Sequence, residues 1–379
     1  MKELIIFLLL LIGLGSQVSS QTTDDVLNLL VQKNVVSQKD ADSISAEAAM
    51  AAQANQAKVK AFPVNAGKKI QFSGYTQMRY QVLDEVGKVD GFDIRRARLD
   101  VKGNISPYWS YRVQFDLVGS PKLIDAYSEL KLNDYFNFTI GQAKIPFSLE
   151  NLTSSNKLEL IDRSQVVEAL VARGKDVGGN QNGRDIGILL GGTLLKLKDR
   201  PVVDYRLGIY NGSGINTLDN NENKDYTARL MLHPIVGLDI SGALYKGTRF
   251  IPEVKTGTVV TTPSKNVTRD RLGFDLNYDW KNLAIRAEYI KGTDDQVDRD
   301  GYYLQGGYYF LQKKFELIAK YDFYDTDMEK ADNASTWYVF GANYNFNPNT
   351  RLQVNYTFKE EEGTSISNNF LGVQFQIGF

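Results

Sequence analysis

The chain has 379 residues, with 44 Lys and Arg against 45 Asp and Glu and a formal net charge of −1. A nucleic-acid-binding protein normally carries a basic excess, so this balance argues against nucleic acid as a partner. Cysteine is absent, which excludes disulfides, thiolate metal sites and a cysteine nucleophile. His233 is the single histidine, so a histidine-rich metal site or a Ser-His-Asp triad is hard to build. We expect no catalytic residue, no metal and no cofactor.

The first 20 residues predict an export signal. Lys2 gives a positive start, residues 4–14 form an apolar run, and small residues precede a cleavage site expected before Gln21. A run this short suits a signal peptide, because a membrane-spanning helix needs about 20 residues. The alternative is a buried N-terminal helix. No later stretch is long and apolar enough to cross a bilayer as a helix, so a spanning protein must use a barrel.

Residues 21–65 differ from the rest of the chain and predict a short periplasmic helical or coiled extension. Residues 24–33 carry apolar side chains at helical spacing, with acidic residues in the first turn. Ser37 and Asp40 resemble a capping box, with Asp in place of Glu, ahead of an Ala-rich second helix. This second helix lacks a wide apolar stripe, so a disordered tether is the alternative.

From Lys69 onward the hydrophobic period changes to two, which predicts β-strands with one apolar and one polar face. In the first such segment Phe72 and Met78 fall on one face, and Gln77 and Arg79 fall on the other. Later segments repeat the scheme. Many have about ten residues, as a tilted membrane strand requires, whereas strands of soluble sheets commonly have about five or six.

Short and long connections alternate between these segments. Tight links are expected near 106–107, 133–134, 199–201, 233–234, 281–282, 312–313 and 347–349. Longer polar loops are expected at 84–91, 144–183, 211–224, 247–268, 292–300, 325–335 and 360–367. This alternation is typical of a barrel with a periplasmic and an external rim, and the segments number about sixteen. The predicted fold class is therefore all-β, a transmembrane antiparallel β-barrel over residues 66–379.

The last segment supports closure of this barrel. Apolar residues alternate from Leu371 to a terminal Phe379, so this strand can pair with the first one. Closure removes two open edges whose backbone groups lipid cannot satisfy.

A barrel of this size keeps an aqueous lumen, because side chains are too short to fill it. By the alternation, the basic side chains predicted to line the pore are Arg79, Arg96, Arg98, Lys102, Arg112, Arg206, Arg229 and Arg286, with Lys320 on the same face. The acids of that face are Asp100, Asp116, Asp125, Glu129, Asp204, Asp275 and Glu288. Rows of fixed charge set pore selectivity, so clustered arginines favour anions. The alternative is that opposite charges on neighbouring strands simply satisfy one another.

The densest basic cluster is Arg95-Arg96-Ala97-Arg98. Strict alternation turns Arg96 and Arg98 inward and leaves Arg95 near the outer rim.

The longest connection runs from Lys144 to Gly183 and contains a helix-like stretch at 163–172. Loops of this length are uncommon in compact folds unless they are functional. We expect this loop to fold into the lumen and narrow it, which would make Lys157, Arg163 and Arg173 pore-lining. The alternative is a surface loop that only shields the rim.

An ordered series of short motifs runs through residues 92–187. In chain order they are Phe92-Asp93-Ile94-Arg95-Arg96-Ala97-Arg98-Leu99, Gly103, Trp109, Gln114-Phe115-Asp116, Asp125-Ala126-Tyr127, Gly141-Gln142-Ala143-Lys144-Ile145-Pro146-Phe147 and Gly183-Arg184-Asp185-Ile186-Gly187. The series resembles the phosphate-selective porin O and P family, in the form common among Bacteroidetes-type bacteria. The resemblance implies a trimeric outer-membrane barrel of about sixteen strands whose third external loop folds into the pore. Arg95, Arg96 and Arg98 match the shared motif, but acids here nearly equal bases, so no full cationic ladder is assigned.

These features predict an outer-membrane porin for passive diffusion of small polar solutes, with selectivity for anions such as phosphate as a further expectation. The expected partners are outer-membrane lipid, small anions or polar solutes, and further copies of the chain in a homotrimer. One alternative is a lipase-like barrel enzyme, which needs a general base, whereas His233 falls in an expected periplasmic turn. The other is a structural or adhesive barrel that does not conduct.

Overall fold

The computed structural model of the chain describes residues 62–65, 68–85, 87–171, 183–256 and 259–379. The predicted signal peptide, the predicted helices of the N-terminal extension and the candidate Arg173 therefore lie outside the described residues. Within the described ranges, no helix has the length and apolar character needed to cross a membrane.

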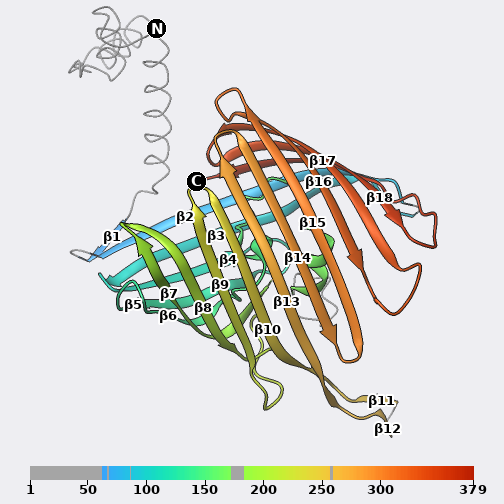
Figure 1. Ribbon diagram of the computed structural model, residues 1–379, viewed down its shortest axis with the longest axis horizontal. Helices are drawn as coiled ribbons and strands as arrows, with labels where there is room; N and C mark the ends of the chain where they lie inside the picture. Colours follow the sequence, from blue (N-terminus) through green and yellow to red (C-terminus); the bar gives the residue numbers. More distant parts are fainter. Residues whose placement is uncertain (1–61, 66–67, 86, 172–182, 257–258) are drawn as a thin grey trace, which may run out of the picture. The chain divides into compact units, whose positions relative to one another are not determined.

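Sixteen antiparallel strands form a closed barrel, which confirms the predicted fold class (Figure 1). The strands are β2 (Lys68–Leu83), β3 (Gly91–Ser106), β4 (Trp109–Asp116), β5 (Lys122–Lys131), β6 (Asn137–Lys144), β7 (Arg184–Leu197), β8 (Arg200–Tyr210), β9 (Asp225–Ile235), β10 (Leu238–Ile251), β13 (Lys265–Trp280), β14 (Leu283–Asp294), β15 (Val297–Phe310), β16 (Phe315–Asp325), β17 (Ala334–Asn347), β18 (Thr350–Glu361) and β19 (Phe370–Gly378). As expected, β19 pairs with β2, and backbone bonds of 3.1 and 3.0 Å between Gly74 and Phe379 complete the seam.

Three short strands lie outside this ring of sixteen. β1 (Phe62–Asn65) pairs with the first residues of β2. These four residues were expected to belong to the helical or coiled extension, and that expectation is wrong. β11 (Val254–Thr256) and β12 (Val259–Thr262) pair with each other in a small separate sheet between β10 and β13.

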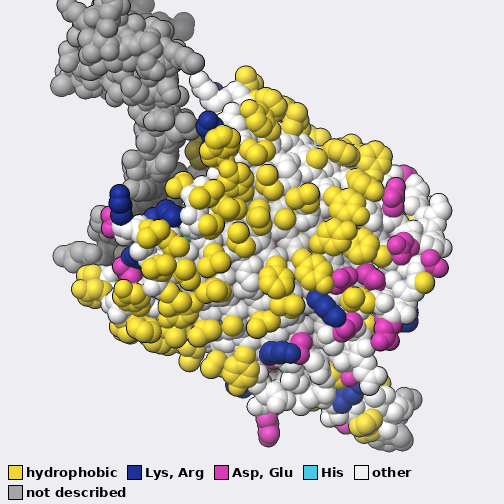
Figure 2. All heavy atoms as spheres, viewed as in Figure 1, with side chains coloured by type: hydrophobic (Ala, Val, Ile, Leu, Met, Phe, Trp, Pro, Cys, Tyr) yellow, Lys and Arg dark blue, Asp and Glu magenta, His cyan; other side chains and the backbone are white. Residues whose placement is uncertain are grey.

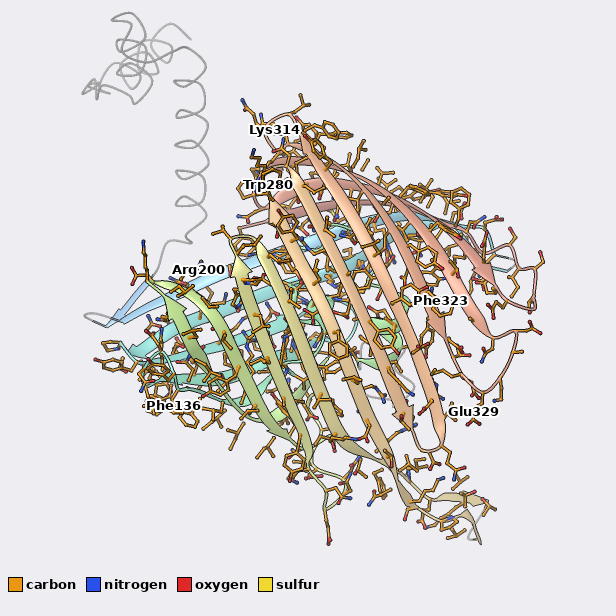
Figure 3. The ribbon with its side chains drawn as sticks, in the orientation of Figure 1. Phe136, Arg200, Trp280, Lys314, Phe323 and Glu329 are labelled. Carbon is orange, nitrogen blue, oxygen red and sulfur yellow. The ribbon has the colours of Figure 1, made fainter. Side chains whose placement is uncertain are left out.

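The barrel has a tight-turn end and a long-connection end. Connections of two to five residues join the strands at the tight-turn end, where Trp280 and Lys314 lie, and Glu329 lies in a longer connection at the other end (Figure 3). Three predicted boundaries are wrong, because strand pairing extends further than the polarity of the sequence indicated. The turn expected at 233–234 lies at 236–237, the loop at 292–300 shrinks to 295–296, and β10 and β13 continue far into the loop at 247–268.

The outer wall is apolar and the inner wall is polar. Figure 2 shows hydrophobic side chains spread over the strands, with charged side chains gathered near the margins. Along β15 the outward Tyr302, Leu304 and Tyr308 are exposed, whereas Tyr303 and Gln305 between them are buried. Tyr302 also packs against the outward Tyr321 and Phe323 of β16, with ring centroids 5.9 and 5.3 Å apart. This period of two over a closed sheet is what a bilayer-spanning barrel requires.

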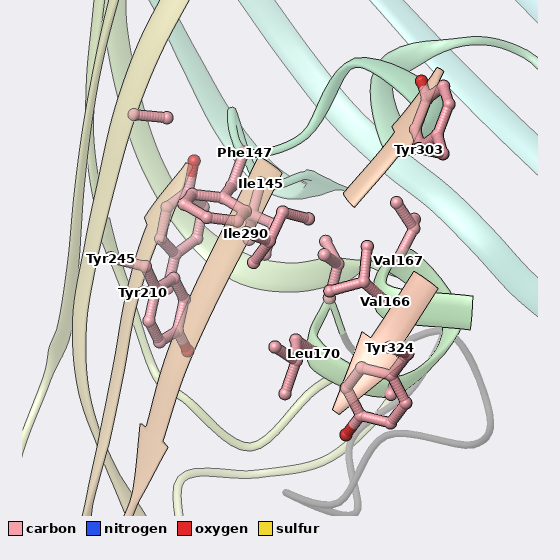
Figure 4. Packing of buried hydrophobic residues seen from close by; sticks show 13 residues of the cluster. Ile145, Phe147, Val166, Val167, Leu170, Tyr210, Tyr245, Ile290, Tyr303 and Tyr324 are labelled. Atoms are coloured by element: carbon pink, nitrogen blue, oxygen red, sulfur yellow. The ribbon is translucent and has the colours of Figure 1, made fainter. Parts of the chain in front are cut away.

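Residues 145–171 of the connection from β6 to β7 lie against the inner face of the wall. This segment contains two short helices, α4 (Leu149–Leu152) and α5 (Gln165–Leu170), where the sequence predicted one helix at 163–172. Its apolar side chains form the main hydrophobic cluster with inward residues of the wall (Figure 4). From the loop come Phe147, Val166 and Leu170, and from the wall come Tyr245 and Ile290. We name residues 145–171 the inner loop.

Glycines in the wall make room for the inner loop. A Cβ on Gly273 would lie 2.9 Å from the Phe147 ring, and one on Gly301 would lie 2.8 Å from Cβ of Val166. Both glycines face inward on strands where neighbouring inward positions carry larger residues. The loop therefore packs closely against the wall at two places where a side chain is missing.

Candidate functional site

Two carboxylates of the wall accept hydrogen bonds from the first residues of the two short helices. Glu288 accepts bonds from the Ser148 hydroxyl, at 2.7 Å, and from the backbone N–H of Leu149. Asp322 accepts a bond from the backbone N–H of Gln165, at 3.1 Å. The first N–H groups of a helix lack partners inside it, so a carboxylate placed there satisfies them.

An ion pair joins the same region of the wall to α4. Lys320 of β16 lies 3.0 Å from Glu150, and the backbone N–H of Ser164 donates to the second oxygen of Glu150 at 2.7 Å. All of these groups are buried. Because each partner satisfies a charge that would otherwise be buried alone, breaking one contact is costly.

Between the helices, residues 155–162 are held by amide side chains of β17, β18 and β19. Asn343 and Gln353 donate to the carbonyl of Glu159 at 2.7 and 3.0 Å, and Asn355 accepts from the N–H of Ile161 at 2.6 Å. Neutral amides suit this role because they donate and accept without adding charge. The loop is thus fixed at both helices and along the segment between them.

A β-bulge changes which arginines face the lumen. In the pairing of β2 with β3, Gln77 lies opposite Arg96 but Met78 lies opposite Ile94, so Arg95 is the extra residue. The Arg95 guanidinium pairs with Asp162 of the inner loop. The prediction that Arg95 lies near the outer rim is therefore wrong, since a bulge interrupts the alternation.

Arg96 is the least neutralised member of this cluster. Its guanidinium donates to Gln77 Oε1 at 2.9 Å and makes no ion pair with a described residue. The charges that act on it most strongly are those of Arg95, Arg98 and Arg163. In contrast, Arg98 lies 3.3 Å from Asp116, and Arg79 makes two bonds of 3.0 and 2.7 Å to Asp93.

The inner loop divides the lumen into cavities with different charge. The arginine cavity, about 940 Å³, is lined by eight basic and four acidic side chains, with Arg79, Arg96 and Lys359 among the former. The Glu159 cavity, about 350 Å³, has three basic and four acidic side chains. The Arg206 cavity, about 460 Å³, has three of each. Of these three cavities, only the first has more basic than acidic side chains.

The arginine cavity lies toward the long-connection end of the barrel. Among its lining residues, Thr326 follows the end of β16, Lys359 is near the end of β18 and Phe370 begins β19. The Glu159 cavity includes Tyr309 and Arg351, which lie next to tight turns.

Two acids of the inner loop have shifted pKa values. Enclosure raises the pKa of Glu159 to about 7, although Arg286 at 2.9 Å opposes the shift. Enclosure also acts to raise the pKa of Asp162, but the charges of Arg95 and Arg79 outweigh it and hold this pKa below its usual value. Near neutral pH, Asp162 is thus ionised while Glu159 is close to its titration midpoint.

The structure separates the predicted pore-lining residues into groups. Arg79, Arg96, Arg98 and Arg163 line the arginine cavity, Lys157 and Arg286 line the Glu159 cavity, and Arg112 and Arg206 line the Arg206 cavity. Lys102 pairs with Asp100 at 3.1 Å and is half exposed. Arg229 is buried against Asp275 at 2.8 Å. Several of these arginines therefore face an acid, as the alternative interpretation anticipated.

Sequence reasoning missed several lining residues. Arg299 and Lys359 lie near strand ends that were assigned to loops or left unassigned, and Glu159 and Asp162 belong to a loop whose path no periodicity indicates. Arg95 did carry a signal. Two successive arginines within an alternating strand place one charge on the lipid side unless a bulge intervenes.

His233 lies at the tight-turn end between two acids. Its Nδ1 is 2.6 Å from Asp239 and its Nε2 is 3.3 Å from Asp204. Within the described ranges, no three His, Asp or Glu side chains are arranged to hold a metal ion.

The closed barrel, its apolar outer wall and its charged lumen define the class of outer-membrane channels. Residues 64–379 match the phosphate-selective porin O and P family, and the chain belongs to that family. Its place is accordingly the bacterial outer membrane.

Solved outer-membrane proteins share the fold. The outer membrane channel DcaP of Acinetobacter baumannii is 14% identical with a TM-score of 0.63, over 84% of this chain and 99% of that one. OmpT of Vibrio cholerae, folded in vitro and in a trimer form, is 14% identical with a TM-score of 0.59, over 82% and 99%. Salmonella typhi OmpF in complex with daunomycin is 11% identical with a TM-score of 0.57, over 83% and 98%. At these identities the likeness concerns the fold alone.

A curated relative is an uncharacterised protein of Aquifex aeolicus (strain VF5). It is 28% identical over 244 residues, which are 56% of this chain and 56% of the relative. The chain thus spans about half the length of the curated relative that it matches.

Proposed function

We propose that this protein is a passive diffusion channel for small polar solutes with a preference for small anions, phosphate among them. The observation that carries the proposal is the arginine cavity, where eight basic side chains face four acids and Arg96 has no carboxylate partner among the described residues. Fixed charges of one sign concentrate mobile ions of the other sign in a narrow lumen. The family description supports phosphate as one of these anions.

The proposal includes an orientation and an assembly. The long-connection end faces the exterior and the tight-turn end faces the periplasm, as is usual for outer-membrane barrels. Solutes entering from outside then meet the arginine cavity before the nearly neutral cavities. The outer wall contacts outer-membrane lipid. The channel forms a homotrimer, and the trimer form of one solved neighbour supports this assembly.

We propose no catalytic role. A lipase-like enzyme would need a general base beside a nucleophile, and both ring nitrogens of His233 face carboxylates at the proposed periplasmic end. A structural barrel with a blocked lumen remains the competing hypothesis, and it predicts no current.

Planar-bilayer recording of the purified full chain tests the proposal. In a KCl gradient we expect a reversal potential with the sign that shows chloride to be more permeant than potassium. Replacing Arg96 with Gln removes one charge, worth about 1 kcal/mol at 4 Å in water, so the anion-to-cation permeability ratio should fall by up to about fivefold. Lys314→Gln removes the same charge from the turn after β15 and is the matched control (Figure 3). Cation selectivity, or the absence of current, would refute the proposal.

A further inference from the structure

Aromatic and cationic side chains alternate across one wall of the arginine cavity. Four consecutive strands of the barrel, β17, β18, β19 and β2, contribute Trp337, Lys359, Phe370 and Arg79 in that order. Lys359 Nζ lies 4.7 Å from the centre of the Trp337 ring, and Arg79 Cζ lies 5.9 Å from the centre of the Phe370 ring. We name these four residues the aromatic–cation row.

The row provides more than an inorganic anion needs. A small ion is bound by charge and hydrogen bonds alone, which the arginines of β2 and β3 supply. The wall of the same cavity also includes Val339 of β17 and Ala169 of α5, so an apolar surface continues from the row to the inner loop. A cavity of about 940 Å³ lies at the upper end of the range, about 300–1,000 Å³, found for sites of small organic ligands.

On the basis of the proposed anion channel, we infer that the arginine cavity binds organic anions in which a phosphate or carboxylate group is attached to a ring. The anionic group meets the guanidinium cluster around Arg96, and the ring lies against the row at Trp337 and Phe370. A sugar and an aryl ring share the required chemistry, because each has a face that packs on an aromatic side chain. Lys359 and Arg79 each place a cation over one of these rings.

Block of the chloride current by four probes tests this inference. The probes are inorganic phosphate, glucose 6-phosphate, phenyl phosphate and uncharged glucose, each added to the external side of the full-length channel. We expect at least one ring-bearing phosphate to block at a concentration about tenfold lower than inorganic phosphate, with glucose inactive. Glucose 6-phosphate as the stronger blocker identifies a sugar ligand, and phenyl phosphate identifies an aryl ligand.

The same measurement is then made in variants. The quantity compared is the blocking concentration of inorganic phosphate divided by that of the stronger ring-bearing phosphate. In Trp337→Ala this ratio should fall from about tenfold to within about twofold. Trp280→Ala is the matched control, since Trp280 is 52% exposed on the outer wall and has Lys281 4.4 Å from its ring centre. Trp337 packs against the cluster of Leu160, Ile318 and Val339, so its removal can disturb the inner loop. Phe370→Leu is therefore a second variant that keeps an apolar side chain in place, and it should lower the ratio as well.

Two results would overturn the inference while leaving anion selectivity intact. One is block by inorganic phosphate at the same concentration as both ring-bearing phosphates. The other is an unchanged ratio in the folded Trp337 and Phe370 variants. Cation selectivity of the unaltered channel would instead overturn the proposed function itself.

Discussion

Arg95 and Arg96 are neighbours in the chain, and both line the arginine cavity. Alternation alone places one of them on the outer face, where a basic side chain costs about 2–4 kcal/mol at the bilayer midplane. The bulge opposite Gln77 and Met78 removes this cost by adding one residue to β3. The pair of arginines thus indicated an irregularity, but its position depends on the register with β2, which one sequence does not contain.

Asp162 neutralises one charge of this cluster, and its removal should increase anion preference. The Asp162 side chain is 45% exposed and pairs with Arg95. Asp162→Asn leaves Arg95 unpaired, so we expect the anion-to-cation permeability ratio to rise by up to about fivefold. Arg95→Gln is the reciprocal variant and should lower the ratio. Reversal potentials in a salt gradient give both values, and a shift of the same sign in the two variants would contradict a lumenal ion pair.

We expect Glu159 to make the ion selectivity of the channel depend on pH. Its enclosure raises its pKa to about 7, so its protonated fraction rises from about one tenth at pH 8 to about nine tenths at pH 6. Arg286, Glu316 and Asp279 are the charges that act on it most strongly. Protonation removes a negative charge from the lumen, so anion preference should increase as the pH falls through 7.

The measurement is the reversal potential at pH 6, 7 and 8. Glu159→Gln keeps the size of the side chain and removes this one titration, so its curve should be flatter than that of the unaltered channel over this range. A wild-type curve with the same slope as the variant's, or an anion preference that rises with pH, would contradict the prediction.

At the scale of elements, the sequence predicts the strands well and their ends poorly. The period of two located the barrel strands because each has one face in lipid and one in water. The ends depend on backbone pairing beyond the apolar band, as in the pairing of Asp294 with Val297, where the side chains are polar and carry no periodic signal. The path of the inner loop depends on contacts such as Asn355 with Ile161, between residues 194 positions apart.

Weakening the packing of the inner loop against the wall should widen the pore. Phe147 is 1% exposed and packs at Gly273, so Phe147→Ala removes about 3–5 kcal/mol of packing free energy from the docked loop. We expect higher single-channel conductance and more current noise. Phe274→Ala is the matched control, because this neighbour of Gly273 points outward and is 54% exposed. An unchanged conductance for Phe147→Ala would show that the loop keeps its place without this ring.

At the scale of the whole molecule, a net charge of −1 coexists with a basic cavity. The composition could not reveal this. Whether a channel prefers anions or cations depends on where its charges lie and not on their sum. Acids such as Glu329 lie in connections outside the strands. Others, such as Asp275, form buried ion pairs with a basic side chain. The motifs around Arg95–Arg98 marked the right region, but only the fold shows which arginines remain unpaired.

A new charge should destabilise the barrel much more on the outer face of the wall than on the inner face. Leu304 is 57% exposed at the centre of the outer face of β15, so Leu304→Arg places a guanidinium in lipid and should lower the free energy of unfolding by about 2–4 kcal/mol. Thr139 lines the Arg206 cavity directly across from Glu129, so Thr139→Arg meets water and an acid and should change it by no more than about 0.5 kcal/mol. Denaturant unfolding in lipid vesicles measures both values. Equal effects would mean that β15 does not face lipid, because the difference arises only where one side of the sheet contacts hydrocarbon and the other contacts water.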